Sequence, residues 1–225
     1  GHWQRCRITE PCPLYRRLGV RDLGQPAERM NPKPAFSVCV YCGSRQGSLP
    51  AYAEVARAVG SWIGQHNGQL VYGGGRNGLM GVVADATLAA GGRVVGVIPR
   101  ALVEKEWAHN GCTELHVVEN MHERKSMMAE RADAFLALPG GIGTFEEFFE
   151  VWTWRQLGYH NKPIGLLNLN GYYDPLLTFL NSVVKQRFMD TWQMDLIQSD
   201  SDAHQLLPRL IQAAGMPTPF LSQAI

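Results

Sequence analysis

The chain has 225 residues, of which 45% are hydrophobic and 18% charged, and its formal net charge is +1. This length allows one large core in one or two domains, and we expect one. Residues 1–29 hold six arginines against three acidic residues, so the remainder carries about −2 and gives no reason to expect nucleic acid or an acidic membrane as a partner. No apolar run is long enough to span a bilayer.

Residues 1–34 are expected to be a non-native or flexible N-terminal extension, because they are rich in proline and arginine and show no sustained periodicity. Gly1-His2 resembles the remnant of a cleaved tag, and Met30 is the expected natural start. The segment has no apolar signal core, and its acidic residues and lack of serine fit a transit peptide poorly. A regulatory arm is the alternative.

Apolar runs alternate with helical patterns from residue 35 onward. Strands are predicted at Phe36–Tyr41, Gln69–Tyr72, Arg93–Ile98, Glu114–Val118, Ala134–Leu138 and Lys162–Leu167. Helices are predicted from Pro50 to Ile63, Leu79 to Ala90, Met121 to Arg131, Phe145 to Gln156, Tyr173 to Phe188 and Ala203 to Ala213. This alternation predicts βαβ units in a Rossmann-like, doubly wound α/β domain over residues 35–225, with helices on both faces of a mainly parallel sheet.

Three glycine-rich loops, 43–47, 73–81 and 140–143, follow predicted strands. Ligands of parallel sheets bind beyond the carboxyl ends of the strands. Glycine lets the backbone approach a ligand closely, and a helix start offers free N–H groups to an anion. Turns of this kind also need glycine for their own conformation, and this simpler explanation competes most strongly for the first loop. The loops lack the common phosphate fingerprints, so we expect a small, singly attached phosphate rather than a nucleoside triphosphate or dinucleotide.

The third loop leads into a helix for which Thr144 is the expected cap, with Glu146 and Glu147 in the first turn. Acidic residues in a first turn are favoured by the helix dipole without any catalytic role. Two carboxylates beside an anion site nevertheless indicate that this loop has a role besides anion binding.

Five cysteines, an odd number in a chain with an ample core, indicate a reducing compartment, and we expect the cytoplasm. Cys39 and Cys42 have the spacing of a metal pair but no second pair accompanies them, so buried strand cysteines are the preferred interpretation. No metal site and no cofactor are predicted.

Three motifs carry a further indication: Pro139-Gly140-Gly141-x-Gly143-Thr144-x-x-Glu147, Gly73-Gly74-Gly75-x-x-Gly78-Leu79-Met80-Gly81 and Met121-His122-x-Arg124-Lys125. Over about residues 35–215 the chain resembles the LOG family, the cytokinin riboside 5′-monophosphate phosphoribohydrolases long mislabelled "lysine decarboxylases". The resemblance implies a Rossmann-like fold, a homodimer and hydrolysis of the N-glycosidic bond of N6-prenylated adenosine monophosphate, or of AMP, to free base and ribose 5-phosphate.

The resemblance also implies roles for individual residues. Arg124 and Glu147 are the expected catalytic pair. Glu106 falls where family members have a substrate-contacting acid. The other expected substrate-binding residues belong to the glycine loops and their flanks: Gly43, Ser44, Gly74, Gly75, Lys125, Gly140, Gly141, Ile142, Gly143, Thr144, Phe145 and Glu146.

Chemistry supports the catalytic pair independently. Breaking an N-glycosidic bond passes through an oxocarbenium-like cation, which a carboxylate such as Glu147 can stabilise while directing a water. Arg124 stays charged near neutral pH, so it can orient Glu147, hold the phosphate or polarise the leaving base. Arg124 as a structural bridge, Glu146 as a peripheral acid, Lys125 as a surface charge and His122 as an ordinary helix histidine are the competing interpretations.

Three aromatic residues, Trp152, Trp154 and Tyr159, are expected to pack in the core or on a dimer face, or to line a pocket for a prenyl tail. Two other functions compete with the hydrolase. A nucleotide or molybdenum-cofactor carrier would use the same phosphate-holding rim but would not need Arg124 and Glu147. A pyridoxal phosphate decarboxylase would need an aldimine lysine, and the chain is small for that task. The sequence does not select among prenylated adenine, adenine and other purines.

Overall fold

The computed structural model describes residues 33–103, 105 and 107–217. The chain divides into the units Gly1–Lys33 and Pro34–Ile225, and the second contains all the described helices and strands. The expectations for the N-terminal extension, the tag remnant and Met30 lie outside the described residues.

Seven strands form one parallel sheet in the order β4-β3-β2-β1-β5-β6-β7. They are β1 Ser37–Tyr41, β2 Gln69–Tyr72, β3 Arg93–Pro99, β4 Glu114–Val118, β5 Ala134–Ala137, β6 Ile164–Leu167 and β7 Ile197–Asp200. The chain builds outward from β1 to β4 and then returns to place β5 on the other side of β1. The topology therefore reverses between β1 and β5, which is where open α/β sheets bind ligands.

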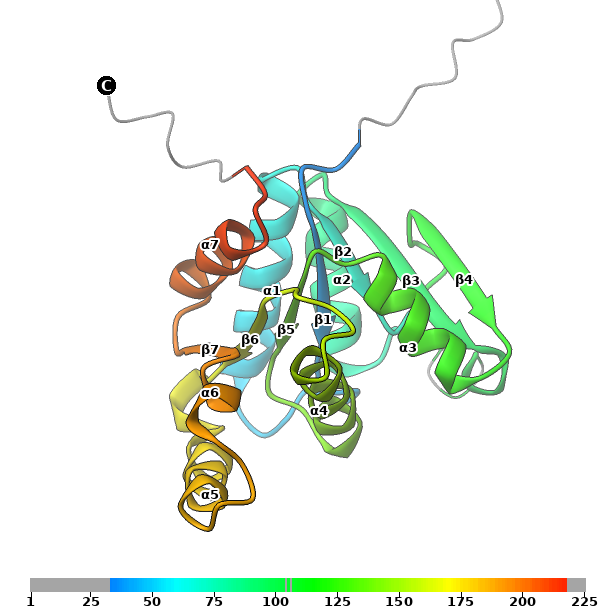
Figure 1. Cartoon of the computed structure of the whole chain (residues 1–225). Coiled ribbons are helices and arrows are strands. Elements are labelled where there is room, and N and C mark those ends of the chain that lie inside the picture. Colours follow the sequence, from blue (N-terminus) through cyan, green and yellow to red (C-terminus); the bar gives the residue numbers. More distant parts are fainter. Residues whose placement is uncertain (1–32, 104, 106, 218–225) are drawn as a thin grey trace, which may run out of the picture. The chain divides into compact units, whose positions relative to one another are not determined.

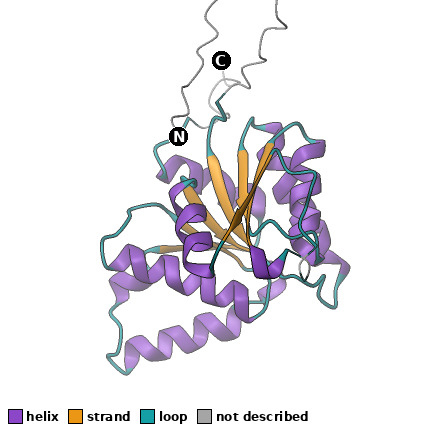
Figure 2. Cartoon of the chain, turned by 90° about the vertical axis from the view of Figure 1, so that its right-hand side faces the viewer, coloured by secondary structure: helices purple, strands orange, loops and turns teal. Residues whose placement is uncertain are grey.

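Helices cover both faces of the sheet, and the strands lie between the helical layers (Figure 2). On one face a core forms against α1 Pro50–Gln65, α2 Gly78–Ala89 and α7 Ala203–Ala213. On the other face a second core forms against α3 Met121–Glu130, α4 Ile142–Gln156 and α5 Asp174–Lys185 (Figure 1). Every residue of β1, β2, β5 and β6 is buried, as expected of strands covered on both sides.

The predicted doubly wound α/β fold is confirmed, and the sheet is parallel throughout. The six predicted strands are present with ends shifted by at most two residues. A seventh strand, β7, and the short helix α6 Thr191–Met194 were not predicted. The fifth predicted helix is shorter than expected, because α5 ends at Lys185 and not at Phe188.

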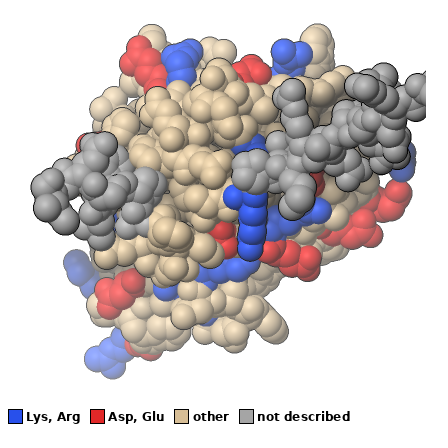
Figure 3. Space-filling model, turned by 90° about the horizontal axis from the view of Figure 1, so that it is seen from above, with Lys and Arg blue, Asp and Glu red and all other residues tan. Residues whose placement is uncertain are grey.

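Acidic and basic side chains are interspersed on the face drawn in Figure 3. Among the residues that the structure describes, no helix is both long and apolar enough to cross a bilayer.

His160 is held as a neutral imidazole beside the sheet. Its Nε2 donates to the Val151 carbonyl at 2.8 Å, and its Nδ1 accepts from the Lys162 N–H at 3.1 Å. Burial lowers the pKa of His160, and the charges of Lys162 and Arg155 act in the same direction. A histidine whose pKa is lower in the folded state stabilises the fold fully above its unfolded pKa, and this contribution declines as the pH falls through that value.

We therefore predict that the free energy of unfolding falls between pH 7.5 and pH 5.5 and that part of this slope disappears in His160→Gln. Urea unfolding at several pH values measures the slope. His204→Gln, which changes an exposed histidine of α7, is the control and should keep the wild-type slope. An unchanged slope in His160→Gln would show that this histidine does not contribute to the pH dependence of the free energy of unfolding.

Candidate functional site

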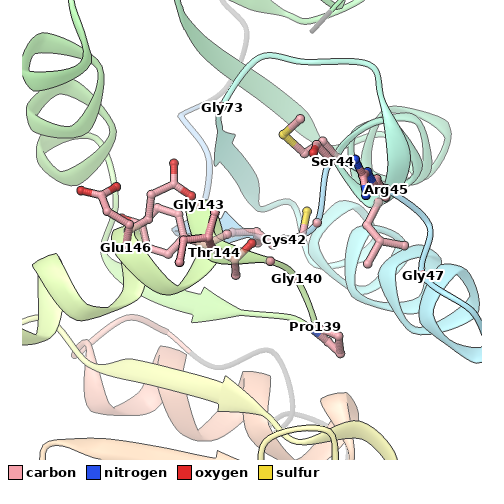
Figure 4. Close-up of a pocket in the computed structure, with 18 of the residues that line it drawn as sticks. Cys42, Ser44, Arg45, Gly47, Gly73, Pro139, Gly140, Gly143, Thr144 and Glu146 are labelled. Atoms are coloured by element: carbon pink, nitrogen blue, oxygen red, sulfur yellow. The ribbon is translucent and has the colours of Figure 1, made fainter. Parts of the chain in front are cut away.

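A cavity of about 680 Å³ lies at the topological switch point. Its walls come from the loops after β1, β2 and β5 and from the starts of α2, α3 and α4. Figure 4 shows Gly143, Thr144 and Glu146 on one side of the cavity, and Ser44 and Arg45 on the other. Pockets that hold small molecules have volumes of roughly 300–1,000 Å³, so this cavity has the size of a ligand site.

The α4 end of the cavity offers backbone donors. Gly141 is the N-cap residue, and the first bond inside the helix runs from Phe145 N to Gly141 O at 3.1 Å. The N–H groups of Ile142, Gly143 and Thr144 precede that bond and have no carbonyl partner within the helix. A Cβ on Gly141 or Gly143 would meet nothing within 4 Å. This open helix start is suited to a phosphate.

The prediction that Thr144 caps α4 is wrong. The helix begins two residues earlier, at Ile142, and Thr144 lies inside it with 4% of its surface exposed. A Cβ on Gly140 would lie 2.1 Å from Thr144 Oγ1, so Gly140 must lack a side chain for this packing. The same shift moves Glu146 and Glu147 out of the first turn, which contains no acidic residue. The dipole at the first turn therefore does not account for these two acids.

The loops after β1 and β5 support each other. Gly43 N donates to Pro139 O at 3.2 Å, and Leu138 N donates to Tyr41 O at 2.9 Å. The Gly43 carbonyl in turn accepts from Leu79 N of α2 at 3.0 Å. Gly43 and its neighbour Ser44 line the cavity opposite α4.

Arg124 reaches the cavity from α3 although only 4% of it is exposed. Its Nε donates to the Val97 carbonyl at 3.1 Å and its Nη2 to the Gly73 carbonyl at 2.8 Å. Buried cations need such partners, since desolvation is costly without them. A Cβ on Gly73 would lie 2.1 Å from Nη2, so the glycine makes room for the guanidinium.

Glu147, on α4, is partly exposed and lines the same cavity as Arg124. Beside it are Cys39, Tyr41 and Cys42 of the β1 segment. Burial raises the pKa of each of these three groups, and the charge of Glu147 raises them further. The thiols and the phenol are therefore neutral at ordinary pH, and Glu147 is the group on this wall suited to work as an anion.

Other predicted residues lie outside the cavity lining. Lys125 Nζ donates to Glu146 Oε1 at 2.6 Å and Glu150 Oε1 at 3.0 Å. Phe145 packs edge-on against Tyr173 at 6.3 Å between ring centroids. The expectation for Glu106 lies outside the described residues.

Gly74 and Gly75 also lie outside the lining, unlike their neighbour Gly73. Gly74 has a φ of +75° and backs onto β3, where its Cβ would be 3.2 Å from Ile98 Cβ. Gly75 forms an antiparallel bridge with Ala108. The geometry of these two glycines serves the scaffold.

Four residues for which the sequence left alternatives open have definite places. His122 is exposed on α3 and is absent from the lining. Trp152 is buried, Trp154 packs against the same core, and Tyr159 is 78% exposed. None of these three aromatics is among the described residues that line the cavity.

Sequence reasoning missed an aromatic wall. Tyr172, after β6, donates from its hydroxyl to the Gly140 carbonyl at 2.6 Å and meets Tyr52 of α1 edge-on at 5.8 Å. Both line the cavity, as do Arg45, Met121 and Leu102. No local motif marks Tyr52 or Tyr172, since their proximity depends on the order of the strands.

Among the described residues, no group of three or more histidine, cysteine, aspartate or glutamate side chains is placed to hold a metal ion. The described cysteines, Cys39, Cys42 and Cys112, are free thiols. Cys39 and Cys42 are both buried, as predicted, with Cys39 in β1 and Cys42 just beyond it.

A family model and several named proteins match this chain over most of its length. A family model described as "Possible lysine decarboxylase" matches residues 80–210. The chain is 52% identical over 162 residues to the cytokinin riboside 5′-monophosphate phosphoribohydrolase of Rhodococcoides fascians, covering 72% of this chain and 80% of that protein. It is 43% identical over 187 residues to the cytokinin riboside 5′-monophosphate phosphoribohydrolase LOG3 of Arabidopsis thaliana, covering 83% and 87%.

Solved structures share the fold. The Moco carrier protein from Chlamydomonas reinhardtii matches with a TM-score of 0.61 and 19% identity, covering 81% of this chain and 98% of that chain. The molybdenum cofactor binding protein from Rippkaea orientalis matches with a TM-score of 0.59 and 20% identity, covering 80% and 96%. At these identities the likeness shows a common fold alone.

The place of Gly74 leads to a stability prediction. Gly74→Ala should lower the free energy of unfolding by about 2–3 kcal/mol, because alanine is strained at positive φ and its Cβ also crowds β3. Gly91→Ala is the matched control, since Gly91 has a φ of +84° with nothing within 4 Å of its Cβ. It should cost only the strain, about 1 kcal/mol. Equal losses in urea unfolding would show that β3 does not crowd position 74.

Proposed function

Because the chain belongs to the LOG family, the group matched by the "Possible lysine decarboxylase" model, we propose that it hydrolyses the N-glycosidic bond of a nucleoside 5′-monophosphate. The products are a free purine base and ribose 5-phosphate. The substrate class is the one in the names of its relatives, cytokinin riboside 5′-monophosphates. AMP, the parent nucleotide without the N6 substituent, is the second proposed substrate. The enzyme is a glycosidase-type hydrolase.

One observation carries this proposal. Arg124 and Glu147 come from different helices, and both line the cavity that also contains the open amino end of α4. A cation, a carboxylate and a set of backbone donors thus surround one space large enough for a ligand. A decarboxylase or a carrier would not require this combination.

The phosphate would bind at the start of α4. The N–H groups of Ile142, Gly143 and Thr144 supply the donors, with Gly43 and Ser44 on the facing loop. Binding energy gained at the phosphate would fix the ribose relative to the helix.

Glu147 would then stand beside the anomeric carbon. Its carboxylate stabilises the positive charge that develops on the ribosyl group and directs the attacking water. Arg124 is held by the Val97 and Gly73 carbonyls. As a permanent cation it orients Glu147 and favours charge building up on the departing base, but it does not act as an acid.

We also propose that the protein works as a homodimer in the cytoplasm, on a purine nucleotide alone and without a cofactor. The three free thiols of the described chain support a reducing compartment. Preference among prenylated adenine, adenine and other purines depends on the shape of the cavity. Leu102 and Met121 give part of its wall an apolar character.

The test is base release from AMP and from its N6-isopentenyl derivative, followed by chromatography without added metal. Glu147→Gln should lower kcat by about 10²–10⁴-fold, because a neutral amide neither stabilises the cation nor activates water. Glu54→Gln, at an exposed acid of α1, is the control and should keep the wild-type rate. A folded Glu147→Gln with wild-type turnover would remove Glu147 from the mechanism. Co-purified pterin without base release from the wild type would favour a carrier.

A second substitution tests whether catalysis depends on the position of the Arg124 guanidinium against Gly73. Gly73→Ala places a Cβ 2.1 Å from Nη2, so the flexible end of the arginine moves while the backbone stays. We expect kcat to fall by about 10²-fold, the loss that displacement of a catalytic group by about 1 Å produces. The melting temperature should also fall, because the displaced guanidinium loses hydrogen bonds while it stays buried, so kcat is measured at a temperature at which the variant is folded. Wild-type kcat in this variant would mean that the position of the guanidinium is not critical.

A further inference from the structure

Lys125, Glu146 and Glu150 form an ion-pair cluster between α3 and α4. The lysine Nζ lies 2.6 Å from Glu146 Oε1 and 3.0 Å from Glu150 Oε1. Only 11% of the lysine side chain is exposed. The cluster therefore ties together the two helices that carry Arg124 and Glu147.

The cluster is adjacent in sequence to both proposed catalytic residues. Lys125 follows Arg124 on α3, and Glu146 precedes Glu147 on α4. Successive helical side chains point in different directions, so Arg124 reaches the carbonyls of Val97 and Gly73 while Lys125 reaches α4. A change in the contact between Lys125 and α4 would shift Glu147 relative to Arg124.

The cluster also places a positive charge beside two carboxylates of α4, Glu146 and Glu150. Glu146 is the neighbour of Glu147 in sequence and Glu150 lies one turn farther along α4, so three carboxylates share one segment of helix. Neighbouring like charges favour protonation of a carboxylate, and a nearby cation opposes it. Lys125 is a cation bound to the two carboxylates that flank Glu147 on α4.

We propose that Lys125 is a positioning residue that holds Glu147 in place and keeps it ionised, and that it is not a ligand of the substrate. This inference rests on the proposed hydrolase function. It replaces the nucleotide-binding role that the sequence resemblance implies for Lys125. The lysine acts through Glu147 and does not touch the reacting atoms.

Other charged and titratable groups also lie near Glu147. Cys39, Tyr41 and Cys42 face it from β1 and are neutral, because burial raises the pKa of each. Arg124 lines the same cavity from α3, donates to the Val97 and Gly73 carbonyls, and adds a positive charge to that of Lys125.

Lys125 itself stays charged. Burial lowers its pKa, but the hydrogen bonds and charges of Glu146 and Glu150 outweigh burial and raise the pKa overall. The cation is therefore present throughout the pH range in which a carboxylate titrates.

The experiment measures kcat and KM for AMP, and the pH profile of kcat/KM, in the wild type and four variants. Lys125→Met should lower kcat by about 10-fold with KM within about twofold, because it loosens the catalytic group and not the phosphate site. The acid limb of the profile should move up by roughly 0.5–1 pH unit, since the carboxylates lose their cation. Lys125→Arg keeps the charge and should recover most of kcat and the wild-type limb.

Glu150→Gln should shift the acid limb of the pH profile in the opposite direction. The amide oxygen still accepts from Lys125 while one negative charge is gone, so the acid limb should move to lower pH. This variant also keeps the test decisive if Lys125→Met does not fold. Arg209→Met is the matched control: it breaks a 2.6 Å ion pair with Asp200 on the opposite face of the sheet and makes the same charge change. Its profile should be that of the wild type.

An increase in KM alone for Lys125→Met would make the lysine a substrate ligand and overturn the proposal. So would unmoved acid limbs in Lys125→Met and Glu150→Gln. Absence of base release by the wild type would overturn the hydrolase function together with this inference. Normal wild-type turnover with a change in KM alone overturns this inference and leaves the function intact.

Discussion

The site depends on a buried guanidinium that is hydrogen-bonded to backbone carbonyls at the carboxyl ends of two strands. Arg124 donates to the carbonyls of Gly73 and Val97, which follow β2 and belong to β3. A cation with 4% exposure requires such acceptors, since desolvation without them is costly. These two hydrogen bonds fix where α3 lies against the sheet. Position 73 is a glycine because a Cβ there would collide with the guanidinium. The direction of Lys125 toward α4 follows from the same placement.

The reversal of strand order between β1 and β5 supplies the rest of the site. It brings the Gly43 loop beside Pro139 and Gly140, where hydrogen bonds and close packing join them. The helix that follows begins with open glycine backbone, and Glu147 comes in its second turn. Phosphate donors and a carboxylate thus lie on one helix, about one turn apart, which suits a nucleotide whose phosphate is bound while its glycosidic bond is broken.

Much of this arrangement could be predicted from the sequence, because buried parallel strands and glycine loops leave strong local patterns. β7 escaped prediction because Ile197–Asp200 is a partly exposed edge strand with one strongly apolar residue. Thr144 was mistaken for a cap because glycine can itself begin a helix. The contributions of Tyr172 and Lys125 could not be predicted, since one depends on the neighbour of β5 in the sheet and the other on the rotation of α3 against α4.

A crystal structure of Glu147→Gln with bound AMP would show directly where the phosphate and the anomeric carbon lie. The phosphate should lie at the N–H groups of Ile142–Thr144, with the anomeric carbon beside residue 147 and with Arg124 still bonded to the Gly73 and Val97 carbonyls. A phosphate bound away from the start of α4, or an anomeric carbon that residue 147 cannot reach even through one water, would contradict the proposed mechanism.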